Sequence, residues 1–179
     1  MEGKMRAQVF YEAEVMKLEM IDIPKISDNE VLVRVKATGI CGSDISYYYG
    51  HSPIGTADGK GPLVLGHEFS GEVVEVGALP ASLGLFKPGD RVTCNPVMQC
   101  NACPACAEGK FNICSNMVVP GVTVNGAFAE YCKLNYTHVY KIPDTMSFED
   151  AAIIEPLACG TIGGKNLDVR AGEFGVVSG

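Results

Sequence analysis

Residues 63–77 read LVLGHEFSGEVVEVG and carry the strongest structural signal in the sequence. β-Branched residues and period-two alternation predict a β-strand here, and a glycine sets the adjacent pair His67–Glu68 in a corner at its start. A second strand-like run, EVLVRVKATGICGSD at residues 30–44, ends the same way, with Cys41 in a glycine-containing corner. Thiolate, imidazole and carboxylate are all zinc ligands, so both corners offer metal-binding groups.

Strand-like runs continue on both sides of these corners. Residues 5–11, 15–23, 90–97 and 126–134 carry β-branched and aromatic side chains, and turn formers such as SDNE, KPGD and VNG separate the runs. We therefore predict a mainly β fold with some α, whose strands form a largely antiparallel, barrel-like domain. The stretch ALPASLGLF at residues 78–86 is interpreted as a surface loop.

The pattern changes to a helical one near the C-terminal end. In PDTMSFEDAAIIEPLACGTIGG, residues 143–164, Ser147 and Asp150 resemble a capping box, and apolar residues follow at helical spacing. One helix is expected from this point. Residues 170–179, RAGEFGVVSG, then predict a turn and a short apolar strand.

Composition excludes several classes of protein. The chain has 179 residues, 47% of them apolar, which suits one domain or one domain plus part of a second. Its net charge of −7 and scattered basic residues provide no surface for a phosphate backbone, so nucleic acid is not an expected partner. No export signal or membrane-length apolar run is present, so we expect a cytoplasmic protein without a membrane partner.

Four of the eight cysteines form a cluster in CNACPACAEGKFNIC. Cys100, Cys103, Cys106 and Cys114 are separated by two, two and seven residues, so short gaps let thiolates converge and the long gap closes the shell. Four sulfurs leave no open position, and we predict a structural zinc. Disulfides, a redox pair and an iron–sulfur cluster are the alternatives, and the spacing favours zinc over all three.

The two corners together suggest a different kind of metal site. Cys41, His67 and Glu68 would give three protein ligands and one open position, which is the arrangement of a catalytic zinc. Each residue also has an ordinary role, as a buried thiol, a hydrogen-bonded core histidine or a solvated turn residue. The residues alone leave both interpretations open.

A family resemblance favours the metal interpretation. GHEFSGEVVEVG resembles the zinc signature of the medium-chain alcohol dehydrogenases, and CGSD, the four-cysteine lobe, GAFAEY and IEPLACG follow in the order of the polyol, sorbitol-like branch. The resemblance covers essentially the whole chain. It implies a GroES-like zinc-binding catalytic domain at residues 1–156 and the start of a nucleotide-binding Rossmann domain at residues 157–179.

The resemblance also implies an enzyme about twice as long as this chain. Gly179 matches the first glycine of a dinucleotide fingerprint, whose other parts would follow. We expect a piece of a zinc-dependent, NAD- or NADP-linked oxidoreductase that acts on a small alcohol or polyol, forms a homo-oligomer and is inactive as these residues alone. The alternative is a zinc-stabilised GroES-like structural or binding module without redox activity.

Several site residues are carried over from the family. Cys41, His67 and Glu68 match the catalytic zinc ligands, which with the lobe gives two zinc ions per chain. Glu155 in EPL matches an acid beside the zinc that ligates it directly or through water.

Three neighbours on the segment after Cys41 also have implied roles. Ser43 matches the hydroxyl that begins a proton relay, with a helix N-cap as its ordinary role, and Asp44 is expected to orient a ligand. Tyr47 matches a substrate-pocket tyrosine, with core packing as its ordinary role. Ser46 stands where the polyol branch commonly has histidine.

The remaining cysteines and histidines have no expected function. Cys94, Cys132 and Cys159 are predicted to be buried and inert. His51 is expected in an exposed loop, and His138 on a surface strand.

Overall fold

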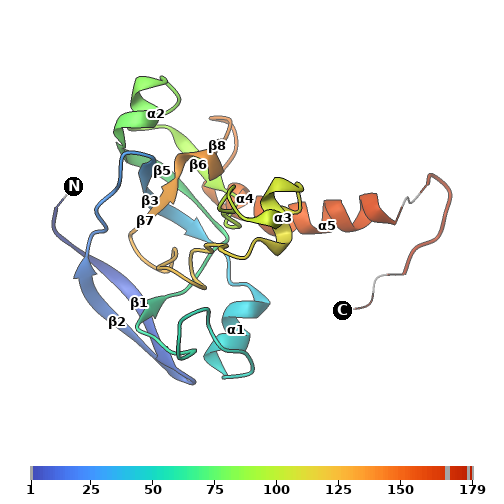
Figure 1. Cartoon of the computed structure of the whole chain (residues 1–179), viewed down its shortest axis with the longest axis horizontal. Coiled ribbons are helices and arrows are strands. Elements are labelled where there is room, and N and C mark those ends of the chain that lie inside the picture. Colours follow the sequence, from blue (N-terminus) through green and yellow to red (C-terminus); the bar gives the residue numbers. More distant parts are fainter. Residues whose placement is uncertain (1, 168–169, 177, 179) are drawn as a thin grey trace.

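The computed structural model describes residues 2–167, 170–176 and 178, and its strands form two antiparallel sheets (Figure 1). The smaller sheet has the order β2-β1-β4, with β1 at Lys4–Glu12, β2 at Val15–Asp22 and β4 at Leu63–Val64. The larger sheet has the order β7-β3-β5-β6-β8. Its strands are β3 (Glu30–Thr38), β5 (Phe69–Val76), β6 (Arg91–Cys94), β7 (Tyr131–Asn135) and β8 (Val139–Lys141).

The two sheets are joined through β1 and the segment that enters β7. Ala7 forms a bridge with Ala129, and the Gln8 N–H donates to the Phe128 carbonyl at 2.7 Å. The strands therefore wrap around one interior, and the predicted mainly β, GroES-like, barrel-like fold is confirmed.

Strand β3 is buried on both faces because successive side chains point to opposite sides of a sheet. Val31 and Val33 belong to the main core cluster, whereas Leu32 packs with Met5 and Ile23 on the other side. The pairing of β3 with β5 ends at Thr38 opposite Phe69. The residues just after β3 therefore lie beside those just before β5, which brings the two glycine-containing corners together.

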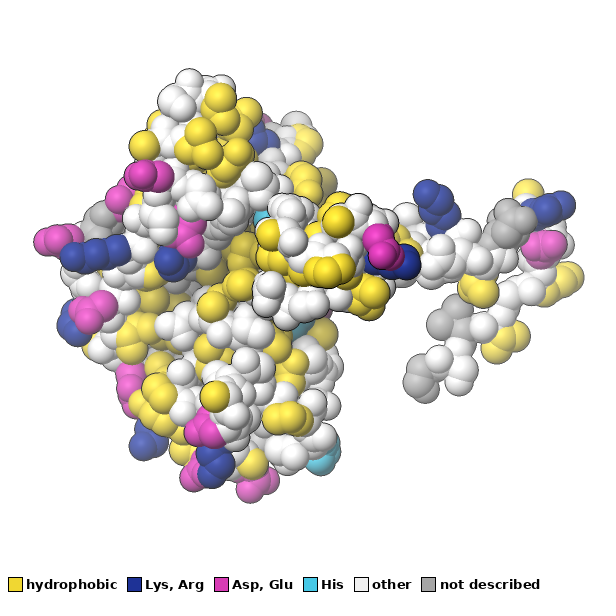
Figure 2. Space-filling view, in the orientation of Figure 1, with side chains coloured by type: hydrophobic (Ala, Val, Ile, Leu, Met, Phe, Trp, Pro, Cys, Tyr) yellow, Lys and Arg dark blue, Asp and Glu magenta, His cyan; other side chains and the backbone are white. Residues whose placement is uncertain are grey.

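The helices are short except for the last. They are α1 (Gly42–Tyr48), α2 (Ala78–Ser82), α3 (Pro104–Ala107), α4 (Phe148–Ala152) and α5 (Ile154–Asn166), with 3-10 turns η1 (Phe111–Ile113) and η2 (Tyr136–His138). The loop expected at residues 78–86 thus contains α2. Three leucines over α2 are exposed (Figure 2): Leu79, Leu83 and Leu85.

The predicted helix start at Ser147 is confirmed, but the helix is divided. Ser147 Oγ accepts a hydrogen bond from the Asp150 N–H at 2.9 Å, and α4 then ends before Ile153. Helix α4 packs on β3 and β5, and α5 begins at once in a new direction. Helix α5 continues across residue 156, where the sequence predicts the end of the catalytic domain. That boundary stays a prediction.

Helix α5 extends away from the barrel (Figures 1 and 2). None of its residues is buried, and the side chains of Leu157 and Ile162 are 65% and 60% exposed. Residues 174–176 and 178, the described part of the expected C-terminal strand, have no strand pairing, and Val177 and Gly179 lie outside the described residues. Within the described part of the chain, no helix combines the length and apolar character needed to cross a membrane.

Candidate catalytic metal site and four-cysteine lobe

Cys41 is placed by the end of β3 and the start of α1. It is the N-cap residue of α1, and its backbone N–H donates to Asp44 Oδ2 at 2.9 Å. An acidic residue at this position of the first turn stabilises a helix start because it satisfies a free N–H group and opposes the helix dipole. Ser43 is inside the helix, so its interpretation as an N-cap was wrong.

His67 and Glu68 lie between β4 and β5, and both are buried, with 9% and 7% of their surface exposed. The Gly39 N–H donates to the Glu68 carbonyl at 2.6 Å, so the corner after β3 is bonded to the corner before β5. A side chain at Gly39 would overlap the Glu68 carboxylate. The glycine therefore makes room for that carboxylate beside Cys41.

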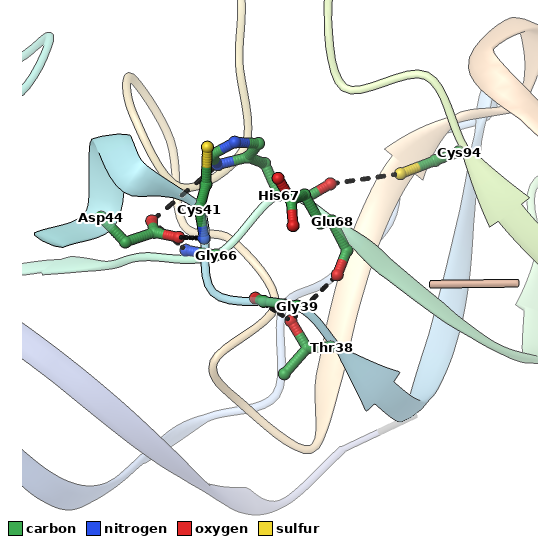
Figure 3. A network of polar contacts seen from close by, with 8 residues as sticks. All are labelled: Thr38, Gly39, Cys41, Asp44, Gly66, His67, Glu68 and Cys94. Atoms are coloured by element: carbon green, nitrogen blue, oxygen red, sulfur yellow. Dashed lines mark hydrogen bonds and ion pairs between the residues drawn. The ribbon is translucent and has the colours of Figure 1, made fainter. Parts of the chain in front are cut away.

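The three predicted ligands converge as expected (Figure 3). One ligand atom from each of Cys41, His67 and Glu68 lies within 4.8 Å of the others. His67 Nδ1 is buried and has no hydrogen-bond partner among the described residues, and its nearest acidic atom is Asp44 Oδ1 at 3.9 Å. A thiolate, an imidazole and a carboxylate whose ligand atoms converge form a suitable donor set for zinc, so these residues fit that ion.

Asp44 lies behind the ligands and contacts both corners. It is 3% exposed, and Oδ1 accepts from the Gly66 N–H at 3.3 Å while Oδ2 accepts from Cys41. Burial raises the pKa of Asp44, and the Cys41 N–H, the nearby His67 and the Gly66 N–H oppose that rise. This arrangement agrees with the predicted orienting role, because a carboxylate beside a ligating histidine fixes its ring.

Glu155 lies in the first turn of α5 and is half-buried. Burial raises the pKa of Glu155, while His67 lowers it and Glu68 raises it, so the carboxyl is close enough to interact with both. It is not part of the group whose ligand atoms lie within 4.8 Å. Its ligation, directly or through water, stays a prediction.

Tyr47 faces the side of α1 away from solvent. It packs against Phe10, Leu63 and Leu65, and it borders a cavity of about 350 Å³. Burial, followed by the charges of Asp44 and Cys41, raises the pKa of Tyr47. The core-packing role is therefore present, and contact with substrate stays a prediction.

The four-cysteine lobe brings its sulfurs together around α3. The Cys103 sulfur lies 3.5 Å from that of Cys106 and 3.9 Å from that of Cys114, and Cys100 and Cys106 sulfurs are 4.0 Å apart. Backbone N–H groups of Cys106 and Ser115 lower the pKa of Cys103 to about 6. All eight cysteines are free thiols, so the disulfide alternative is not supported. Converging sulfurs that accept N–H bonds fit the predicted closed thiolate site.

Two of the residues without an expected function are placed differently from the sequence interpretation. His138 lies in η2 and is 5% exposed, so it is not a surface residue, and burial lowers its pKa. Cys159 is exposed on α5, where Glu155 is the main cause of its raised pKa. Cys94 and Cys132 are buried and His51 is exposed, as predicted.

Comparison with known proteins shows the family of this chain. The family model of the alcohol dehydrogenase GroES-like domain matches residues 27–144. The chain belongs to this family. The matched residues of this GroES-like domain include both candidate metal sites, apart from Glu155.

Individual relatives show which branch of the family the chain resembles. The chain is 38% identical over 176 residues to sorbitol dehydrogenase of Bacillus subtilis, covering 98% of this chain and 49% of that protein. It is 39% identical over 166 residues to the Aspergillus clavatus protein named "Probable D-xylulose reductase A", covering 92% of this chain and 45% of that protein. A solved short chain alcohol dehydrogenase of Escherichia coli CFT073 with bound NADH superposes with a TM-score of 0.81 at 34% identity, covering 91% and 45%. The predicted polyol-branch resemblance is confirmed, and the chain spans about half the length of the curated relatives it matches.

Proposed function

We propose that this chain is the catalytic-domain part of a zinc-dependent oxidoreductase that transfers a hydride from an alcohol or polyol to NAD or NADP. The observation that carries the proposal is the convergence of Cys41, His67 and Glu68 from two separate corners of the barrel. A closed four-cysteine site could stabilise a module without any of these three residues. Relatives named for sorbitol and D-xylulose support a polyol as the substrate class.

The residues divide the chemistry among them. Cys41, His67 and Glu68 would hold the ion, and a bound zinc supplies the Lewis acidity that favours loss of a hydroxyl proton from the substrate. Asp44 holds the His67 ring by accepting from Nδ1–H after a small rotation from the present 3.9 Å, which fixes the tautomer. Ser43 lies two residues from Cys41 and is half-buried, so its hydroxyl can take up the substrate proton and pass it to solvent.

Glu155 contributes a second carboxyl at the same site. Burial is the main cause that raises the pKa of Glu155, so the ionised form is less stable at this position than in water. A nearby cation would stabilise the ionised form. The hydride acceptor is a bound nicotinamide, which the rest of the enzyme would hold against the substrate carbon.

The proposal is tested on the gene expressed together with the coding sequence that follows residue 179. We expect oxidation of sorbitol or xylitol with NAD or NADP, and we expect His67→Ala to abolish it while removing one of two zinc ions. His51→Ala is the matched control, since it makes the same change at an exposed histidine. No dinucleotide-linked turnover with both metal sites filled would favour the structural or binding module instead.

A further inference from the structure

We infer that residues 125–128, which we call the bracing segment, position the candidate catalytic metal site by fixing the backbone directly before His67. Among the described residues, its hydrogen bonds to this corner go to residues 64–66 and not to Cys41, His67 or Glu68, so its role is one of positioning. The inference rests on the proposed function only in requiring that Cys41, His67 and Glu68 bind an ion.

The backbone before His67 has little support from its own sheet. Strand β4 has only two residues, and Val64 and Leu63 pair with Val9 and Phe10 of β1. Leu65 and Gly66 lie beyond the strand end. Because these residues lead directly to the ligands, their backbone groups need partners from elsewhere.

The bracing segment supplies those partners through four hydrogen bonds. Asn125 Oδ1 accepts from the Val64 N–H at 3.0 Å, and the Gly126 N–H donates to the Val64 carbonyl at 2.7 Å. The Phe128 N–H donates to Leu65 at 2.9 Å, and the Ala127 N–H donates to Gly66 at 2.8 Å. Every residue from 64 to 66 is therefore bonded to the bracing segment.

Close packing makes this attachment rigid. A side chain at Gly126 would overlap the Gly66 carbonyl oxygen, and one at Gly121 would lie 2.7 Å from the Gly66 nitrogen. Gly66 itself has φ +89°, and a side chain on it would overlap the Phe128 ring. Gly66 is thus enclosed by backbone on one side and by an aromatic ring on the other.

A displacement at Gly66 would reach two ligands. Gly66 is covalently joined to His67, and its N–H donates to Asp44 Oδ1 (Figure 3). Asp44 in turn accepts from the Cys41 N–H. Metal–ligand distances in proteins lie within about 0.2 Å of their standard values. A small movement of Gly66 should therefore lower the metal affinity of the Cys41–His67–Glu68 site and leave that of the four-cysteine lobe unchanged.

The test measures metal binding by the chain itself. Cobalt absorption spectra and zinc competition with a chelator are recorded, and the four-cysteine lobe serves as the internal reference. We expect Gly126→Ala to weaken the Cys41–His67–Glu68 site at least about tenfold, the size typical of outer-shell changes at metal sites, and to alter its cobalt spectrum.

Three further variants separate a positioning role from a general loss of stability. Gly77→Ala introduces a comparable overlap, 2.5 Å from the carbonyl oxygens of Ser27 and Asp28, at the far end of β5. It should lower stability and leave the cobalt spectrum unchanged. Asn125→Ala removes only the acceptor for Val64 and should weaken the site several-fold, whereas Asn125→Asp keeps an acceptor and should restore wild-type affinity.

The outcomes distinguish the inference from the proposed function. Wild-type affinity and an unchanged spectrum in Gly126→Ala would overturn the inference, with the proposed function intact. If Gly126→Ala does not fold, the Asn125 pair decides: unchanged affinity in Asn125→Ala overturns the inference, and loss with recovery in Asn125→Asp supports it. A wild-type chain that binds metal only in the lobe would overturn both.

Discussion

Asp44 connects the start of α1 to the candidate catalytic metal site. It is buried, it accepts from the N–H groups of Cys41 and Gly66 with different oxygens, and it lies 3.9 Å from His67 Nδ1. We expect Asp44→Asn, which keeps only one acceptor oxygen, to lower stability and to weaken the Cys41–His67–Glu68 site strongly.

The expected sizes follow from opposing contributions. A hydrogen bond to a charged group contributes about 1.5–3 kcal/mol, and burial of the carboxylate, which raises the pKa of Asp44, opposes this gain. Asparagine keeps one acceptor oxygen and sets an NH2 group against the other backbone N–H, so Asp44→Asn should lower the free energy of unfolding by about 1–3 kcal/mol. Asp44→Ala leaves two N–H groups without their acceptor and should cost about 1–3 kcal/mol after the same offset.

Metal binding should respond differently because the ion adds an attraction for the carboxylate. Loss of a carboxylate partner behind a ligating histidine lowers metal affinity about 10–100-fold, or about 1.4–2.7 kcal/mol. Chelator competition measures this affinity, and urea denaturation with one zinc equivalent, held by the four-cysteine lobe, measures stability. A folded Asp44→Asn protein with wild-type affinity would show that Asp44 only caps α1.

Three other predictions concern the lobe, the approach to Glu68 and a buried histidine. Cys114→Ser should lose one zinc equivalent, measured by metal analysis. It should also lose about 4 kcal/mol of stability in thermal unfolding when free zinc exceeds the Kd of the lobe a thousandfold. Cys159→Ser, at an exposed cysteine, should lose neither. Gly39→Ala should displace the Glu68 carboxylate and weaken the same site about tenfold in competition assays, so an unchanged affinity would contradict the assigned packing. Burial lowers the pKa of His138, so as the pH falls the unfolded chain takes up a proton at this histidine before the folded chain does. The free energy of unfolding should therefore fall as the pH drops below about 6.5. His138→Phe should flatten that dependence in denaturation midpoints between about pH 5.5 and 7.5, and identical slopes would refute the assignment.

Local pattern located most of the strands and the four-cysteine lobe, but it did not show that the run 63–77 is divided between β4 and β5, which lie in different sheets. Period-two alternation located β3 and β5, and the Ser147–Asp150 pattern located the start of α4. The lobe was readable because its ligands lie within one short segment, so spacing alone limits how they can converge. The joining of Cys41 to the pair His67–Glu68 was different, because the residues alone left it open and the family resemblance favoured it.

The burial of individual side chains was predicted less well than secondary structure. His138 follows a strand-like run, yet η2 turns its ring into the interior, and no local pattern signals that turn. Cys159 lies in an apolar helical pattern that normally indicates burial, but no other described part of the chain buries any residue of α5. Burial depends on what lies opposite a residue, which its neighbours in sequence do not specify.

The chemical groups of this protein could be named from its residues: the candidate metal ligands, the closed spacing of the lobe and the strands that end at each corner. How those groups come together depends on the folded chain. The register that sets Thr38 opposite Phe69 brings Cys41 beside His67 and Glu68, and contacts from residues 125–128 fix the backbone that carries them. The physical reason is that ligand identity is a covalent property of single residues, whereas the position of a ligand is set by pairing between strands distant in the chain.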